Sequence, residues 1–197
     1  SCDIAWLTLD EADADFRTFV AALEGVLRGA LGAAGVAGAL IEEGRGEPAA
    51  LARALANELS AASSRRARDA VIFFDDFHVV QACAGVRELV GGLLRGLPPR
   101  LHVVIAGRLP LDFAPVAKLR ADGLVADFTQ NDLRFTPEEA VALLEGSGLE
   151  AAERETYSQL VRRADGWAMA LRLSAQVAPA LEAARLIVAG LLEPGRV

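Results

Sequence analysis

The sequence contains few cysteines, no excess of basic residues and no apolar run long enough to span a membrane. Its two cysteines, Cys2 and Cys83, lie far apart and lack metal-ligand spacing, which argues against a disulfide framework or a zinc site. The net charge of -7 and the pI of about 4.9 leave no broad basic surface for nucleic acid. The longest uncharged, mostly apolar stretch, residues 29–41, is shorter than the roughly 20 residues of a membrane-spanning helix. We therefore expect neither direct nucleic-acid binding nor membrane insertion.

Four short apolar runs separate longer helical stretches, which predicts an α/β fold. The runs are residues 4–9, 71–74, 101–106 and 124–128. Three of them are nearly unbroken, as is typical of strands covered on both faces in a parallel sheet. We therefore expect a parallel sheet with helices on both faces. The start of the chain lacks the basic residues and apolar core of a signal peptide, so we expect a cytoplasmic protein.

The helical stretches predict a second, all-helical part. Residues 12–31 and 48–62 favour helices, with a loop marked by the glycines between 29 and 46, and an apolar stripe predicts a third helix ending at Gly96. After residue 128 the pattern is helical only, and it opens with Thr136 and Glu139 as a capping box around Pro137. Further helices are expected at 137–145, 151–164, 167–178 and 180–192. We place the boundary between an α/β core, residues 1–130, and a small helical lid, residues 131–197.

The run VIFFDD at residues 71–76 is an apolar strand that ends in two carboxylates, Asp75 and Asp76. Ligands of open parallel sheets bind at the carboxyl ends of strands. This is a Walker B pattern, in which the first acid positions Mg²⁺, usually through water, and the second orients the attacking water. On these residues alone, the two acids are also compatible with the start of a solvated loop.

The next strand, residues 101–106, is followed by a cation, Arg108. A guanidinium there can recognise a γ-phosphate through bidentate hydrogen bonds, although an exposed arginine at a loop start is the simpler interpretation. One strand that ends in acids and a second that is followed by a cation, with one helix between them, indicate a ligand site more specifically than either feature alone. His78 follows the acids and either hydrogen-bonds them or anchors the loop. His102 is expected to be structural.

The phosphate-binding loop that should accompany these residues is absent. That loop has the pattern Gly-x-x-x-x-Gly-Lys-Ser/Thr, whose backbone N–H groups and lysine hold the phosphates. The single lysine, Lys118, has no preceding glycine and no following hydroxyl residue, and it stands in a helical context. We therefore expect weak ATP binding at most by this chain.

Taken in chain order, five motifs resemble the nucleotide-binding region of the large, maltose-activator-like ATP-binding regulators of the LuxR type. These regulators belong to the signal-transduction ATPases with numerous domains. The resemblance covers nearly the whole chain, and five motifs in the right order are more specific than any one of them. The motifs are AWLTLD at 5–10, FFDDFH at 73–78, LPPRLHVVIAGR at 97–108, LRFTPEEA at 133–140 and DGWAMAL at 165–171.

The resemblance implies a role for each matching residue. Asp75 would be the magnesium-side acid, Asp76 the catalytic acid and Arg108 the γ-phosphate sensor. Gly166 and Trp167 would lie near the adenine or the hinge of the helical lid, although related families have a proline close by where this chain has none.

The resemblance also implies an ATP-driven switch with Mg²⁺ and ATP or ADP as cofactors. Such proteins rest with ADP, assemble with ATP and an inducer, and activate transcription through a carboxyl-terminal helix-turn-helix domain. The expected partners are further copies or other domains of the parent protein, and a small-molecule inducer that binds domains absent from this chain.

In that fold the strand carrying the phosphate loop lies inside the sheet, beside the strand that ends at Arg108. Without it, backbone groups of the flanking strands are unpaired. We therefore expect this chain to be a fragment of a longer protein in which residues before Ser1 supply the missing strand.

Two functions remain open. The first is the ATPase-type regulatory core of a bacterial-type transcriptional activator, inactive or weakly binding as this chain. The alternative is a degenerate, nucleotide-free interaction module of the same fold. A metabolic enzyme has less support, because no nucleophile or metal cluster accompanies the acids. A glycine-rich loop shortly before Ser1 would favour the first function.

Overall fold

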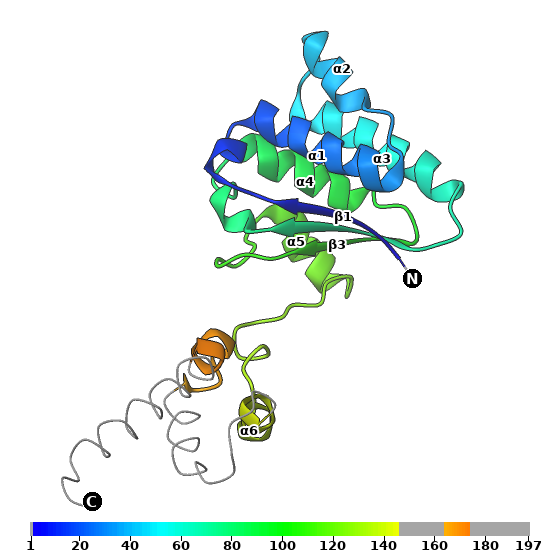
Figure 1. Cartoon of the computed structure of the whole chain (residues 1–197). Coiled ribbons are helices and arrows are strands. Elements are labelled where there is room, and N and C mark those ends of the chain that lie inside the picture. Colours follow the sequence, from blue (N-terminus) through cyan, green and yellow to red (C-terminus); the bar gives the residue numbers. More distant parts are fainter. Residues whose placement is uncertain (1, 146–163, 174–197) are drawn as a thin grey trace, which may run out of the picture. The chain divides into compact units, whose positions relative to one another are not determined.

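The computed structural model describes residues 2–145 and 164–173 (Figure 1). The chain divides into two compact units, Ser1–Ala126 and Asp127–Val197. The sheet belongs to the first unit, and the regular elements in the described part of the second unit are helices.

Three of the four expected strands form one parallel sheet in the order β1-β2-β3 (Figure 1). They are β1 (Asp3–Thr8), β2 (Ala70–Asp75) and β3 (Leu101–Ile105). The register sets Thr8 beside Asp75, so the carboxyl ends of the strands meet at one edge of the sheet. The expected α/β fold with a P-loop-like parallel sheet is thereby confirmed.

One face of the sheet is covered by three amphipathic helices, α1 (Phe16–Leu31), α3 (Pro48–Ser64) and α4 (Ala84–Arg95) (Figure 1). All three were expected from the sequence, and α4 ends at Gly96 as predicted. Every second side chain of the strands points into this layer, and burial of such side chains stabilises the fold by about 25 cal/mol per Å² of apolar surface. The strand residues buried in this way are Ala5, Leu7, Ala70, Ile72, Phe74 and Leu101.

The side chains on the second face of the sheet remain accessible. Ile4 is 54% exposed, Trp6 is 50% exposed and Val104 is 41% exposed. Trp6 stacks on Phe73 of the neighbouring strand, with ring centroids 3.9 Å apart and planes within 3°. The expectation of helices on both faces therefore holds for one face only in the described part of the chain.

The prediction of a fourth strand at residues 124–128 was wrong. This segment forms no strand, and its Leu124 and Phe128 are 73% and 76% exposed. An apolar pattern shows only that a segment favours a strand, which forms when its backbone groups meet a neighbouring strand. After β3 the chain enters α5 (Ala114–Ala121), which packs against α4, and no later strand in the described residues pairs with β3.

The glycine-marked segment 29–46, expected to be a loop, contains the short helix α2 (Val36–Glu42). Its amino end is held by Glu58 of α3, whose carboxylate accepts hydrogen bonds from backbone N–H groups that include Gly35 at 3.0 Å. Gly35 has a φ of 87°, which a residue with a side chain rarely adopts. The sequence pattern missed α2 because its capping group comes from a distant helix.

In the second unit, α6 (Pro137–Glu145) begins at the expected capping box. The Thr136 N–H donates to Glu139 Oε2 at 2.9 Å, and the Glu139 N–H donates to Thr136 Oγ1 at 3.2 Å. Residues 168–173 are also helical, as predicted. The other predicted helices lie almost entirely outside the described residues, at 151–164 and 180–192. None of the helices in the described part of the chain is both long and apolar enough to cross a membrane.

Candidate functional site

The two acids predicted as site residues lie at the carboxyl end of β2. Asp75 is the last residue of this strand, and one of its carboxylate oxygens accepts the Asp76 N–H at 3.1 Å. Asp76 has left-handed backbone angles, φ 55° and ψ 34°. Aspartate tolerates this region better than most residues, but such a conformation costs free energy and is common at functional sites. The carboxylate of Asp76 is 47% exposed, so a ligand can reach it.

The loop after β3 lies against the loop that contains these acids. The Ala106 N–H donates to the carbonyl of Phe74 at 2.8 Å, and the Phe77 N–H donates to the carbonyl of Ala106 at 2.9 Å. A Cβ atom on Gly107 would come within 3.2 Å of the His78 backbone nitrogen. Arg108 follows directly and is exposed. The structure thus brings the acid-ended and the cation-ended strand together at one edge of the sheet.

Two supporting residues were missed by the sequence reasoning. Phe77 is fully buried, and its ring lies 6.0 Å from that of Phe74 and 6.5 Å from that of Phe113. It therefore holds the acidic loop on the core. Gly107 permits the close approach of the two loops. An apolar residue directly after the two acids, and a glycine directly before Arg108, were the available signals.

His78 lies beside Asp76 but is not within hydrogen-bond distance of it. Its Nδ1 atom is 3.7 Å from Asp76 Oδ1 and is buried without a hydrogen-bond partner. The imidazole is 20% exposed. An unpaired buried nitrogen is costly, so this group is the least satisfied part of the candidate site.

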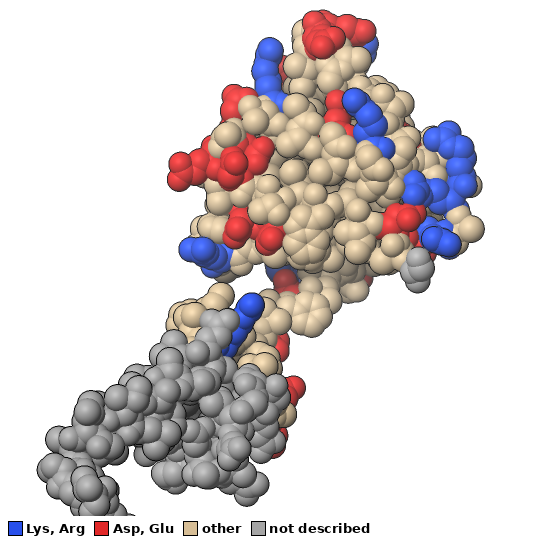
Figure 2. All heavy atoms as spheres, in the orientation of Figure 1, with Lys and Arg blue, Asp and Glu red and all other residues tan. Residues whose placement is uncertain are grey.

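The end of β1 adds further acids to the same edge of the sheet. The Leu9 N–H donates to the carbonyl of Asp75 at 3.1 Å, and the next residues form the short helix η1 (Glu11–Ala14). Asp10 and Asp13 close a capping box around η1, and Asp15 caps α1. In Figure 2 acidic side chains gather over the end of the unit at which η1 lies. These acids disfavour a free anion there, because like charges repel.

Neighbouring residues lower the pKa of Asp15, one of the acids at this end of the unit. Its carboxylate accepts hydrogen bonds from the N–H groups of Arg17 at 3.1 Å and Thr18 at 3.0 Å. The backbone and side-chain hydrogen bonds of Thr18 lower the pKa of Asp15, with smaller contributions from Arg17. Asp15 is therefore a helix-capping anion.

The residues present fit Mg²⁺ only as part of a larger ligand set. In the described residues, no group of three or more His, Cys, Asp or Glu side chains is placed to hold a metal ion. Asp75 offers a hard oxygen, and Mg²⁺ commonly binds one or two carboxylates together with phosphates and water. Asp75 therefore fits a magnesium ion that a nucleotide brings to the site.

Gly166 and Trp167, the predicted nucleotide contacts, belong to the second unit. Gly166 has a φ of 72°, and a Cβ atom there would lie 2.6 Å from the carbonyl oxygen of Phe135. The Phe135 N–H donates to the Gly166 carbonyl at 2.9 Å, and Arg134 pairs with Asp165. Gly166 therefore has a packing role within its own unit. The side chain of Trp167 is 61% exposed.

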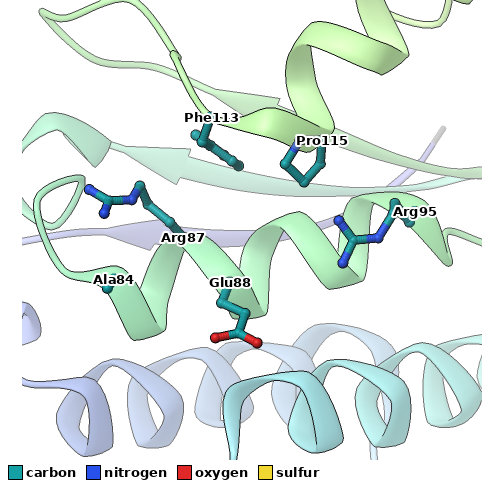
Figure 3. A pocket seen from close by; sticks show the side chains of 6 residues that line it. All are labelled: Ala84, Arg87, Glu88, Arg95, Phe113 and Pro115. Carbon is teal, nitrogen blue, oxygen red and sulfur yellow. The ribbon is translucent and has the colours of Figure 1, made fainter.

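A groove lies away from the acids, between α4 and the start of α5 (Figure 3). Its volume is about 260 Å³, and the residues that line it are Ala84, Arg87, Glu88 and Arg95 of α4 together with Phe113 and Pro115. Arg87 donates to the carbonyl of Gln81 at 2.9 Å, so its charge already holds the loop before α4. No acid of the candidate site lines this groove.

Comparison with known proteins reveals distant relatives, and no protein-family model matches the chain. The HTH-type transcriptional regulator AlkS of Ectopseudomonas oleovorans is 28% identical over 127 residues, which are 64% of this chain and 14% of AlkS. The serine/threonine-protein kinase PknK of Mycobacterium tuberculosis, and that of Mycobacterium bovis, are each 30% identical over 175 residues, 87% of this chain and 15% of the kinase. The chain thus spans about one seventh of the length of these curated relatives. The matches support a distant relationship to regulator-type proteins.

Proposed function

We propose that this chain is part of the ATP-binding switch of a transcriptional regulator and contributes the acid and arginine side of the nucleotide site. The observation that carries the proposal is the placement of Asp75, Asp76 and Arg108. They lie at or just after the carboxyl ends of two adjacent parallel strands, where ligands of such sheets bind. The distant similarity to AlkS, a transcriptional regulator, agrees with this role.

Each residue has one task in the proposed site. Asp75 holds Mg²⁺ through water, and Asp76 accepts a hydrogen bond from the water that attacks the γ-phosphate. Arg108 binds the γ-phosphate and so distinguishes ATP from ADP. The magnesium ion supplies charge neutralisation at the phosphates when nucleotide is bound.

The remaining part of the site is a phosphate-binding loop, and the free edge of β3 indicates where its strand would join. Hydrogen bonds to β2 use the N–H of Ala106 and the carbonyl of Arg100. Because backbone groups alternate in direction along a strand, those of Val103 and Ile105 point away from β2. A strand followed by a helix could pair with this edge and also cover the exposed sheet face that includes Trp6. A glycine-rich loop between them would lie next to the carboxyl end of β3, one strand away from Asp75.

We further propose that nucleotide exchange controls assembly of the longer protein in the cytoplasm, with self-association, other domains and a small-molecule inducer as partners. Gly166 and Trp167 would then contact the nucleotide or the hinge between the units. These assignments follow from the family resemblance of the five motifs.

A nucleotide-free interaction module is the second candidate. The apolar sheet face with Ile4 and Trp6 at least half exposed favours this function, because monomeric proteins rarely leave contiguous apolar surface accessible. Acids around the edge of the sheet also oppose anion binding. This candidate predicts partner binding without any response to nucleotide.

Calorimetric titration with Mg·ATP and Mg·ADP distinguishes the two functions. It should be run on this chain and on a version extended upstream of Ser1 to include a glycine-rich phosphate loop. We expect binding by the extended version only. In that version Asp76→Ala should retain binding and lose hydrolysis, and Arg108→Ala should reduce the preference for ATP. Arg95→Ala is the matched control, because Arg95 is an exposed arginine at the carboxyl end of α4. It should change neither hydrolysis nor the preference for ATP.

A further inference from the structure

We infer that the groove between α4 and the start of α5 is a docking site for an extended acidic segment of a partner protein, in which two acids flank one apolar residue. The groove has a volume of about 260 Å³ and lies between side chains of α4 and of the segment that leads into α5 (Figure 3). No residue of the candidate nucleotide site lines it. Docking there needs no nucleotide, so the inference goes beyond the proposed function.

The apolar wall of the groove is held in place by several contacts. Phe113 packs against the hydrophobic core of the first unit. Pro115 approaches α4 closely because residue 91 is glycine, and a Cβ atom on Gly91 would lie 2.7 Å from Pro115 Cγ. The side-chain amide of Gln81 donates to the Pro110 carbonyl at 2.8 Å, which ties the loop before α4 to the segment that carries Phe113. The groove is therefore formed before any partner arrives.

Two arginines of α4 line the groove and can bind carboxylates. Arg95 is exposed and makes no hydrogen bond or ion pair with the described residues. Arg87 donates through Nη1 to the carbonyls of Gln81 at 2.9 Å and Ala82 at 3.3 Å. Its other guanidinium nitrogens make no hydrogen bond to the described residues. Because a guanidinium carries several N–H donors that match a carboxylate, the groove offers two points for acid binding.

The helices on either side of the groove are basic, although the chain as a whole is acidic. Together α4 and α5 carry four basic residues, Arg87, Arg95, Lys118 and Arg120, and one acid, Glu88. The whole chain has a net charge of -7. Opposite charges attract each other over about 8 Å at physiological ionic strength. The charge of these helices therefore favours an acidic partner.

The spacing of the two arginines sets the length of the docked segment. Arg87 and Arg95 are eight residues apart, which corresponds to about 12 Å along a helix. In an extended chain, two residues separated by four positions lie about 13 Å apart, on the same side as the residue midway between them. An apolar side chain at this middle position would contact Phe113 and Pro115. The acids that cap η1 and α1 in a second copy are engaged with their own helices, so they do not provide such a segment.

Glu88 gives the docking site a feature of opposite sign. This residue follows Arg87 directly, lines the groove and is exposed. Its carboxylate repels the acids of the docked segment. Removal of this charge should therefore strengthen binding, whereas removal of a neighbouring arginine charge should weaken it. A groove that only packs two helices together predicts no such pair of opposite effects.

The test is a binding measurement on this chain without nucleotide. The probe is a fluorescent, serine-rich peptide with one leucine and a glutamate two residues to each side of it, and fluorescence anisotropy reports binding at low ionic strength. We expect Arg95→Glu to raise the Kd about ten-fold and Glu88→Gln to lower it about two-fold. Arg53→Ala, which alters an exposed arginine of α3, is the matched control and should leave the Kd unchanged.

Two further peptides separate the charged from the apolar contribution. Glutamine in place of both glutamates should abolish binding, and serine in place of the leucine should weaken it. Circular dichroism verifies that each protein variant folds. No binding of the acidic peptide, equal binding of the glutamine peptide, or an unchanged Kd in Arg95→Glu would overturn the inference. Self-association that is lost in Arg95→Glu, measured by sedimentation velocity, would assign the groove to a second copy and would also overturn it.

Discussion

The two faces of the three-stranded sheet differ in what covers them. On one face Ile72 and Phe74 are fully buried beneath helices, whereas on the other Ile4 and Trp6 are at least half exposed. Both faces carry mostly apolar side chains in sequence. The difference shows that an apolar pattern alone predicts only that the side chains of a strand favour burial. Whether they are buried depends on the presence of an element that packs against them.

The covered face accounts for the stability of the first unit, and the uncovered face leaves apolar side chains accessible. Beside the uncovered face, the outer edge of β3 carries backbone groups that no described strand pairs. An exposed apolar edge of this kind invites pairing with another chain segment. The candidate nucleotide site lies at the carboxyl end of β3, where this outer edge ends.

The largest effect on the free energy of unfolding is expected from the replacement of Phe74, which lies on the covered face. Phe74→Ala should lower the free energy of unfolding by about 3–5 kcal/mol, because it leaves a cavity in a closed layer. Phe73→Ala, one residue away on the accessible face, should cost clearly less. Urea unfolding followed by circular dichroism measures both. Equal losses would show that the second face is also closed in solution.

The second prediction compares backbone amides along β3. Val104 N–H should exchange with solvent about 100-fold more slowly than the N–H groups of Val103 and Ile105, because only Val104 donates to β2. NMR hydrogen exchange reports all three in one sample. Addition of a phosphate-loop strand should slow the two fast amides. Uniformly slow exchange in the chain alone would mean that the edge is already paired.

The third prediction concerns Trp6. Trp6→Ser should change the free energy of unfolding by about 1 kcal/mol or less, because the ring is half exposed, and it should reduce concentration-dependent association. Sedimentation velocity measures the association. Arg95→Ala is the control, as it alters an exposed residue on the helical side. Association that persists in Trp6→Ser would point away from the apolar face.

The smallest effect is expected at Asp15, which caps a helix of the covered face. Its pKa is lowered in the folded state, so its contribution is complete above the unfolded value of about 3.8 and is lost as the pH falls below it. The stability difference between the wild type and Asp15→Ala should therefore shrink on acidification. Thermal unfolding at several pH values measures it. Asp132→Ala, a similarly bonded acid in the second unit, should leave the first unit unchanged.

The sequence was sufficient for the elements whose signals are local. Three apolar runs became the strands, Gly96 ended α4, and Thr136 with Glu139 began α6. The acids at the end of β2 were also placed correctly at the edge of the sheet. Each of these features depends on residues close together in the chain.

The features that could not be predicted depend on contacts between distant segments. Glu58 caps α2 from another helix, and the segment predicted as a strand at 124–128 pairs with no strand in the described part of the chain. The same holds in the candidate site, where the 3.7 Å between His78 and Asp76 follows from backbone angles and from the approach of Gly107. No local pattern contains this information.

The most direct test of the account is a titration of Mg·ATP into this chain, into the version extended by a phosphate loop, and into that version carrying Asp75→Ala. The account predicts no measurable binding by the chain alone, binding by the extended version, and a loss of the magnesium-dependent part of that binding in Asp75→Ala. Tight binding by the chain alone, or binding by the extended version that is unaffected by Asp75→Ala, would contradict it.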